Sequence, residues 1–274
     1  IPVHKETKPL KTRISKQKID RSAPKMSSRD SIQKEVLEVV NAYYDSDDEN
    51  IRPDNDQILI LRKKVNESKG LRKALYQYYL ANKYVSYIGR YTNRAKKKDI
   101  TPLSELPEDY KTWAVNDFYR EADQLYSQSL SNGPILQQEK TQLWNRLIDQ
   151  LEFTKYRPTL YDLVATDYLK FLQGLPFDYD NSAKKKIAEI KNNLYQFHAN
   201  DDDKTALLYL KSTEIEGDVK KQLQQLEALA DSYPKEPFSA YLLFQAANLA
   251  KQEISENNFL NAHQLCQKAI DRIP

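Results

Sequence analysis

The sequence predicts an all-α fold in which antiparallel helix pairs stack as a tetratricopeptide-like α-solenoid. Apolar residues recur at helical spacing in most segments after residue 28. The chain has only 5 Gly in 274 residues, too few for the many tight turns of a strand-rich fold. Near the C-terminus the similar segments 231–234 and 271–274 each end a helix pair. Their spacing is somewhat longer than the ~34 residues of a tetratricopeptide repeat, which indicates repeats with extended loops.

Three regions are predicted along the chain. Residues 1–28 are a basic flexible arm or linker, because their apolar residues are too sparse to form a core. Residues 29–176 are a helical region organised around a helix at 158–172. Residues 177–274 are tetratricopeptide-like helix pairs, each burying its apolar stripe against its neighbours.

Charge is distributed unevenly. The formal net charge is +3, but the first 29 residues hold nine Lys or Arg against two acidic residues, so the rest of the chain is slightly acidic. A basic arm can bind nucleic acid or anionic lipid. A solvated tail or linker explains the same composition, and we favour it. The net positive charge of the whole chain therefore does not argue for a nucleic-acid-binding face on the body.

The helical region contains five predicted helices before the organising one. They span residues 29–44, 54–65, 71–91, 112–132 and 135–153. Gly133 and Pro134 are placed to end the fourth. The third is rich in tyrosine, which favours either base stacking with nucleic acid or burial in a core. Because Leu75, Tyr79 and Ile88 lie at core spacing, we favour burial.

The organising helix begins at Pro158, which suits the first helical position because its missing N–H has no helical partner there. Thr159 and Asp162 form a capping-box pattern. Gly174 and Pro176 then end the helix. Six apolar residues fall on one face: Leu160, Leu163, Val164, Tyr168, Phe171 and Leu172.

Five more helices are predicted in the last region, at residues 183–198, 204–215, 218–232, 238–253 and 258–272. Gly217 marks the turn of one pair. The small residues Ala246, Ala247 and Ala250 predict a close approach between helices.

An acidic segment superficially resembles a calcium loop through Asp45, Asp47 and Glu49, with Asp56 at the twelfth position. The sixth position is Asn50 rather than the Gly that the sharp turn needs, and the twelfth is Asp rather than Glu. A solvated loop is the interpretation we favour.

The chain lacks the usual signatures of chemistry. It has no glycine-rich phosphate loop, Cys-x-x-Cys, His-x-x-x-His or Gly-x-Ser-x-Gly motif. His4, His198 and His263 are each isolated, and His198 is expected at a helix C-terminus, where its charge is favourable. His263 and Cys266 lie one turn apart, but no third ligand or orienting residue accompanies them. We therefore predict no catalytic, cofactor-binding or metal-binding residue, no cofactor and no enzymatic activity.

Other features bear on cellular context. The single cysteine excludes an internal disulfide without determining the compartment. No run approaches the length of a membrane-spanning helix. Because the chain begins with Ile1 and ends within a helical pattern, we expect a processed or trimmed piece of a longer protein.

The string Arg157-Pro158-Thr159-Leu160-Tyr161-Asp162-Leu163-Val164-Ala165 resembles the helical region ahead of the macroglobulin domains in large bacterial alpha-2-macroglobulin family proteins. The similarity covers roughly residues 71–274, and the repeats in it are generic. Further matching pieces occur in the same order: Asn93-Arg94, Asp99-Ile100, Lys111-Thr112-Trp113, Asn116-Asp117-Phe118, Tyr126 to Leu130, and Leu265 to Ile270.

The resemblance implies a secreted, envelope-associated protein that traps proteases: a protease cuts a bait segment, the molecule rearranges, and many members bind the attacker through a thioester. The thioester motif Cys-x-Glu-Gln is absent, since Gln267-Lys268 follows Cys266. The resemblance thus implies a periplasmic, cell-envelope or extracellular location and protein partners, either other domains of the parent chain or envelope proteins. We expect no nucleic-acid partner.

The leading functional prediction is a non-catalytic helical scaffold or protein-interaction region of a bacterial alpha-2-macroglobulin-like broad-spectrum protease inhibitor, with the bait and thioester machinery outside this fragment. The alternative is a free-standing tetratricopeptide-like module of the cell envelope that binds a peptide or protein. A third hypothesis is binding to nucleic acid or an anionic surface through the arm, with steep salt dependence.

Overall fold

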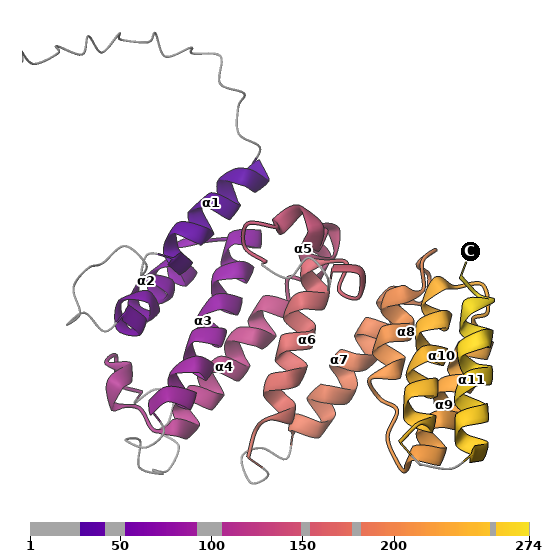
Figure 1. The fold of residues 1–274 in the computed structure, drawn as a ribbon. Coiled ribbons are helices and arrows are strands. Elements are labelled where there is room, and N and C mark those ends of the chain that lie inside the picture. Colours follow the sequence, from indigo (N-terminus) through magenta and orange to yellow (C-terminus); the bar gives the residue numbers. More distant parts are fainter. Residues whose placement is uncertain are drawn as a thin grey trace, which may run out of the picture.

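The computed structural model describes residues 28–41, 53–91, 106–148, 154–176, 182–252 and 256–273. Within these ranges the fold is all-helical, with eleven α-helices and no strand apart from one isolated β-bridge. The helices lie in one row from α1 to α11 (Figure 1). Of the predicted arm at 1–28, residues 1–27 fall outside the described residues and Ser28 begins α1. Asp45, Asp47 and Glu49 of the segment that resembles a calcium loop also fall outside the described residues.

The predicted helices match the observed ones within a few residues, except for two between residues 112 and 153. The α-helices are α1 (Ser28–Asn41), α2 (Pro53–Glu67), α3 (Gly70–Tyr91), α4 (Val115–Leu130), α5 (Gly133–Gln138), α6 (Leu160–Gln173), α7 (Ala183–His198), α8 (Thr205–Ser212), α9 (Val219–Ser232), α10 (Pro237–Ala250) and α11 (Glu256–Ile270). Two 3-10 helices, η2 (Tyr110–Thr112) and η3 (Thr141–Trp144), precede α4 and follow α5.

A first hydrophobic core joins α1 to α7. α3 is central to it and contacts α1, α2, α4 and α5. Tyr76, Tyr78 and Tyr84 of α3 are buried, which confirms the prediction that this tyrosine-rich helix packs in a core. Their hydroxyls still find partners: Tyr76 donates to Glu35 at 3.2 Å and Tyr78 to Asp167 at 2.6 Å. Tyrosine suits these places because its ring is buried while its hydroxyl reaches a polar group.

The N-terminus of α6 forms the predicted capping box. The backbone N–H of Thr159 donates to Oδ2 of Asp162 at 2.8 Å, and the N–H of Asp162 donates to Oγ1 of Thr159 at 3.4 Å. Pro158, however, is not the first helical residue. It precedes the N-cap Thr159, and its carbonyl accepts a hydrogen bond from the N–H of Thr141.

The predicted helix at 135–153 is wrong. Up to residue 148, where the described stretch ends, only α5 and the short η3 form there, and the chain between them is extended at Glu139 and Lys140. Lys140 forms a β-bridge with Thr159, and the N–H of Leu160 donates to the carbonyl of Glu139 at 2.9 Å. These bonds to the start of α6 replace the helical bonds that the local pattern favoured.

The boundaries around α4 also differ from the prediction. The predicted start at 112 is a 3-10 turn, and Trp113 lies between it and α4, where its indole N–H donates to the carbonyl of Pro107 at 2.7 Å. Gly133 and Pro134 begin α5 rather than ending α4. Gly133 packs close to the ring of Tyr161: a Cβ there would lie 3.5 Å from that ring.

A second hydrophobic core joins α8 to α11. α10 is its centre and packs against α8, α9 and α11. Ala246, Ala247 and Ala250 are buried, which confirms the predicted close approach of helices at these residues. Gly217 makes the turn into α9 with a φ of +124°, a conformation that disfavours any residue with a Cβ.

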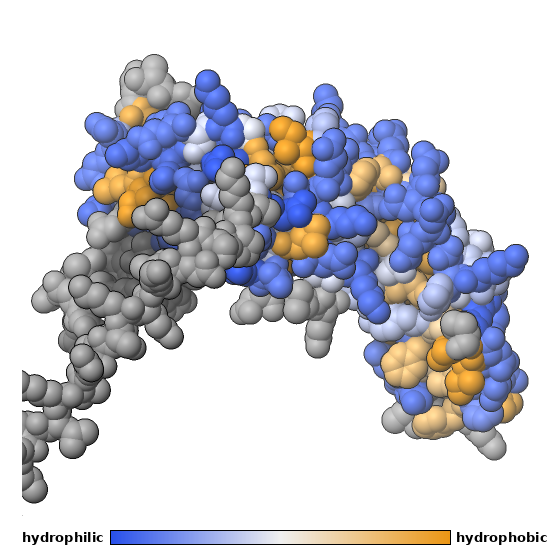
Figure 2. Space-filling view, turned by 90° about the horizontal axis from the view of Figure 1, so that it is seen from above, coloured by the Kyte–Doolittle hydropathy of each residue, from blue (hydrophilic) through white to orange (hydrophobic). Residues whose placement is uncertain are grey.

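The two cores meet near α7. Ile190 and Leu194 of α7 belong to the first core, whereas Leu208 of α8 belongs to the second. The predicted division at residue 177 stays a prediction, but this packing groups α7 with the helices before it. On the face seen in Figure 2, polar side chains surround several smaller apolar patches.

Candidate functional site

The outer face of α10 carries the side chains of a surface groove. Leu242, Leu243, Ala246 and Ala247 face the second core and are fully buried. The helical period therefore directs a second set of residues outward. This set consists of Tyr241, Phe244, Gln245, Asn248 and Leu249, with Gln252 just beyond the helix.

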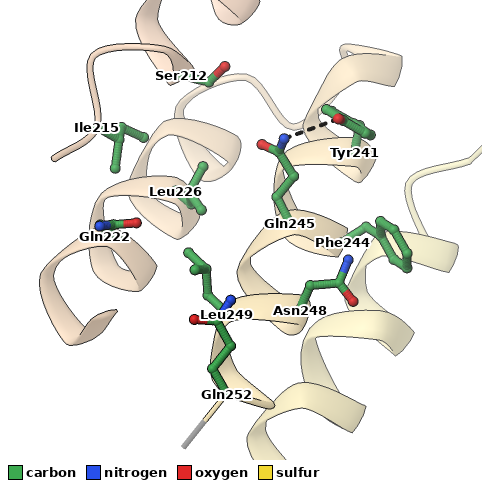
Figure 3. Close-up of a pocket in the computed structure, with 10 residues that line it drawn as sticks. All are labelled: Ser212, Ile215, Gln222, Leu226, Tyr241, Phe244, Gln245, Asn248, Leu249 and Gln252. Carbon is green, nitrogen blue, oxygen red and sulfur yellow. Dashed lines mark hydrogen bonds between the residues drawn. The ribbon is translucent and has the colours of Figure 1, made fainter. Parts of the chain in front are cut away.

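The opposite wall of the groove comes from the end of α8, the following connection and α9. It consists of Ser212, Ile215, Gln222 and Leu226. The groove has a volume of about 400 Å³ and opens to solvent between α9 and α10 (Figure 3). Grooves of this size accommodate a few side chains of a peptide or a small organic ligand.

None of the described residues that line the groove is charged, although 30% of the chain is charged. Three glutamines and one asparagine supply amides that both donate and accept hydrogen bonds. Tyr241 and Phe244 are 43% and 50% exposed, so their rings are available for contact. Gln245 Nε2 donates to the Tyr241 hydroxyl at 3.1 Å, which orients both side chains along the groove (Figure 3). Such a lining matches an uncharged ligand with amide groups.

A second cavity, of about 480 Å³, lies among α3, α4 and α6. Its main acidic residue, Asp167, accepts the Tyr78 hydroxyl and pairs with Arg157 and Lys170. The hydroxyl of Tyr126 in turn donates to Asn82. The polar groups of this cavity thus serve internal contacts between helices.

A third cavity, of about 560 Å³, is bordered by His198 at the end of α7. The ring is buried, with Nε2 2.7 Å from Oδ1 of Asp162 and Nδ1 2.7 Å from Oδ2 of Asp201. Burial disfavours the charged ring, but the hydrogen bonds and charges of the two carboxylates outweigh it and raise the His198 pKa. The position at a helix C-terminus is as predicted, but His198 is not isolated.

The structure assigns no site to His263 and Cys266, the other pair considered from the sequence. His263 is exposed on α11 and Cys266 is half-buried on the same helix. Among the described residues, no group of three or more His, Cys, Asp or Glu side chains is arranged to hold a metal ion. In the same part of the chain, no helix is both long and apolar enough to cross a lipid bilayer.

Sequence reasoning assigned no site residue and so missed both the groove and the carboxylates around His198. The groove had one usable signal: Tyr241, Phe244 and Gln245 fall opposite the most apolar face of the predicted helix 238–253. The pairing of His198 with Asp162 had no such signal in the sequence, because 36 residues separate the two.

Comparison of the chain with protein-family models, with curated proteins and with solved structures finds no match.

Proposed function

We propose that this chain is a non-catalytic helical scaffold that binds a protein partner through the groove on α10. The observation that carries the proposal is the lining of that groove, which combines exposed aromatic rings with neutral amides. Aromatic residues are enriched in protein interfaces, and amide side chains can pair with the N–H and C=O groups of an extended peptide. The preferred ligand is an uncharged, extended peptide segment, since a phosphate backbone would require basic side chains.

The finer architecture proposed for this scaffold is a stack of antiparallel helix pairs, similar to a tetratricopeptide solenoid. The row of helices and the short turn at Gly217 support it. A hydrogen bond between the two helix pairs also supports this architecture: the side chain of Arg272, just after α11, donates to the carbonyl of Ala230 in α9 at 2.8 Å. In such a stack each pair leaves one face free for a ligand.

The biological setting follows from the sequence resemblance. The proposed parent is a bacterial alpha-2-macroglobulin-like, broad-spectrum protease inhibitor of the periplasm, cell envelope or extracellular space. The groove would then hold a segment of another domain of the parent chain, or an envelope protein. A test is to add a protease to the full-length protein. Rearrangement and capture of the protease are expected, and their absence would contradict this setting.

The groove also favours the alternative, a free-standing peptide-binding or protein-binding module of the envelope. The two settings differ in the source of the peptide. Peptides tiled across the rest of the parent chain, compared with peptides from envelope proteins, would separate them by which set binds.

The binding proposal itself is tested by selecting short uncharged peptides against this chain and measuring affinity by calorimetry. Phe244→Ala and Asn248→Ala should each weaken binding, with about a tenfold or larger loss for Phe244→Ala. Phe259→Ala is the matched control, because Phe259 is 53% exposed but lies on α11 outside the groove. Equal losses for Phe244→Ala and Phe259→Ala, or no binding of any peptide, would contradict the proposal.

A further inference from the structure

The two contacts of His198 constrain its protonation state. A neutral imidazole carries one N–H, so it donates to one carboxylate and turns a lone pair toward the other. Here both ring nitrogens lie 2.7 Å from a carboxylate oxygen. Only the imidazolium form donates to Asp162 and Asp201 together. The geometry therefore depends on a proton.

The three side chains connect three different parts of the fold. Asp162 lies in the first turn of α6, His198 is the last residue of α7, and Asp201 belongs to the turn that leads to α8. This turn is also where the first core gives way to the second, between Leu194 and Leu208. The contacts of His198 thus fasten the link between the two cores.

We infer that Asp162, His198 and Asp201 form a proton-dependent latch that holds the α7–α8 turn against α6 while the ring is charged and releases Asp201 when the ring loses its proton. Asp162 keeps its contact because it is buried and also accepts from the N–H and hydroxyl of Thr159, both at 2.8 Å. The Asp201 side chain is 39% exposed, so water can replace the imidazole there.

The neighbouring charged groups do not provide an alternative switch. Lys204 donates through Nζ to the carbonyls of Ala199 and Asp201, and Asp203 accepts from the backbone N–H of Thr205. Lys140 and Lys155 line the cavity beside the ring. Among the described residues that line this cavity, His198 is the one whose side-chain type ordinarily changes charge near neutral pH.

The direction of the pH effect follows from the raised pKa of His198. The latch contributes fully below the ordinary histidine pKa of 6.5, and its contribution is lost as the pH rises through the higher pKa of the folded protein. Mild alkali should therefore loosen the turn. The ion pair between Lys191 and Glu214, at 2.8 Å, still joins α7 to the segment after α8 under those conditions.

The experiment combines histidine NMR titration with hydrogen exchange of the backbone amides at 199–204. His198 should titrate above the ordinary histidine pKa of 6.5. After correction for intrinsic base catalysis, exchange at 199–204 should rise about threefold to tenfold above the His198 transition, the effect of losing one hydrogen bond that water partly replaces. Exchange of the backbone amides of α11 in the same sample serves as the internal reference.

Two variants make the test specific. Asp201→Asn should lower the pKa of His198 and remove the pH dependence of exchange at 199–204. Asp202→Asn removes the same charge from an exposed neighbour and should change neither. Asp201→Asn is the variant on which the test depends, because the Asp201 side chain lies partly at the surface. Titration of His198 at or below the ordinary value of 6.5, or equal behaviour of the two Asp→Asn variants, would overturn the latch.

Discussion

The indole Nε1 of Trp144 donates a hydrogen bond to Oε2 of Glu139, 3.1 Å away. The same oxygen accepts from Nε of Arg29 in α1, at 2.8 Å and 110 residues distant in sequence. Trp144 is completely buried, so Glu139 is the polar anchor of a large core side chain. This contact lies where the chain leaves helical geometry.

Removal of that anchor should destabilise the first core. Glu139→Ala leaves the buried indole N–H without its acceptor, which costs about 1–3 kcal/mol in free energy of unfolding. Glu216→Ala, which removes an exposed carboxylate, is the control and should stay within about 0.5 kcal/mol of the parent protein. Urea unfolding followed by tryptophan fluorescence measures both. A Glu139→Ala midpoint equal to that of Glu216→Ala would show that the contact adds no stability.

The capping box of α6 should also be measurable. Thr159→Ala removes the side chain that accepts from the N–H of Asp162 and donates to its carboxylate, at a cost of about 1–2 kcal/mol. Thr213→Ala, at an exposed site after α8, is a matched control with a smaller expected effect. Thermal unfolding by circular dichroism compares them. If Thr159→Ala is no more destabilising than Thr213→Ala, the cap is dispensable.

The second core depends on α10. Leu242 is fully buried there, so Leu242→Ala should lower the free energy of unfolding by about 2–5 kcal/mol through lost contacts and a cavity. Leu260→Ala makes the same change on α11, where the side chain is 59% exposed, and should alter stability by less than about 0.5 kcal/mol. Chemical denaturation of both variants measures the difference. Similar losses would mean that α10 is not the centre of this core.

Glu35 makes part of the stability of α1 depend on pH. Burial opposes its charge, but hydrogen bonds from Lys64, Arg72 and Tyr76 outweigh burial and lower the Glu35 pKa. Its contribution is therefore present above the ordinary value of 4.5 and disappears as the pH falls through the lower pKa of the folded state. Glu35→Gln should cost about 0.5–1 kcal/mol at pH 7 and nothing near pH 2.

The control for this prediction is Glu38→Gln, one turn later on α1. The Glu38 side chain is 66% exposed and pairs with Lys34 only at 3.9 Å. Its replacement should leave the pH dependence of the unfolding midpoint unchanged. A Glu35→Gln curve parallel to that of the parent protein from pH 2 to pH 7 would contradict the assigned contacts.

Local information in the sequence was sufficient for most of the helices. The apolar stripes on α6, α9 and α10 and the Thr159–Asp162 capping pattern act within a few residues, so the sequence displays them directly. The packing of α3 in a core also followed from the spacing of Leu75, Tyr79 and Ile88, of which Leu75 and Ile88 are buried. For the same reason, the turn at Gly217 could be placed in advance.

Tertiary structure alone decided the features that join distant residues. The helix predicted at 135–153 does not form because hydrogen bonds to Pro158 and Leu160 compete with helical ones. The local sequence pattern cannot show that competition, since the partners lie beyond the pattern. The meeting of His198 with Asp162 and the walls of the groove on α10 likewise arise from helix packing. The sequence thus determined most of the helices, but not the breaks in helical geometry between residues 130 and 148. The tertiary structure determined which side chains they bring together, since those contacts depend on packing between helices rather than on order along the chain.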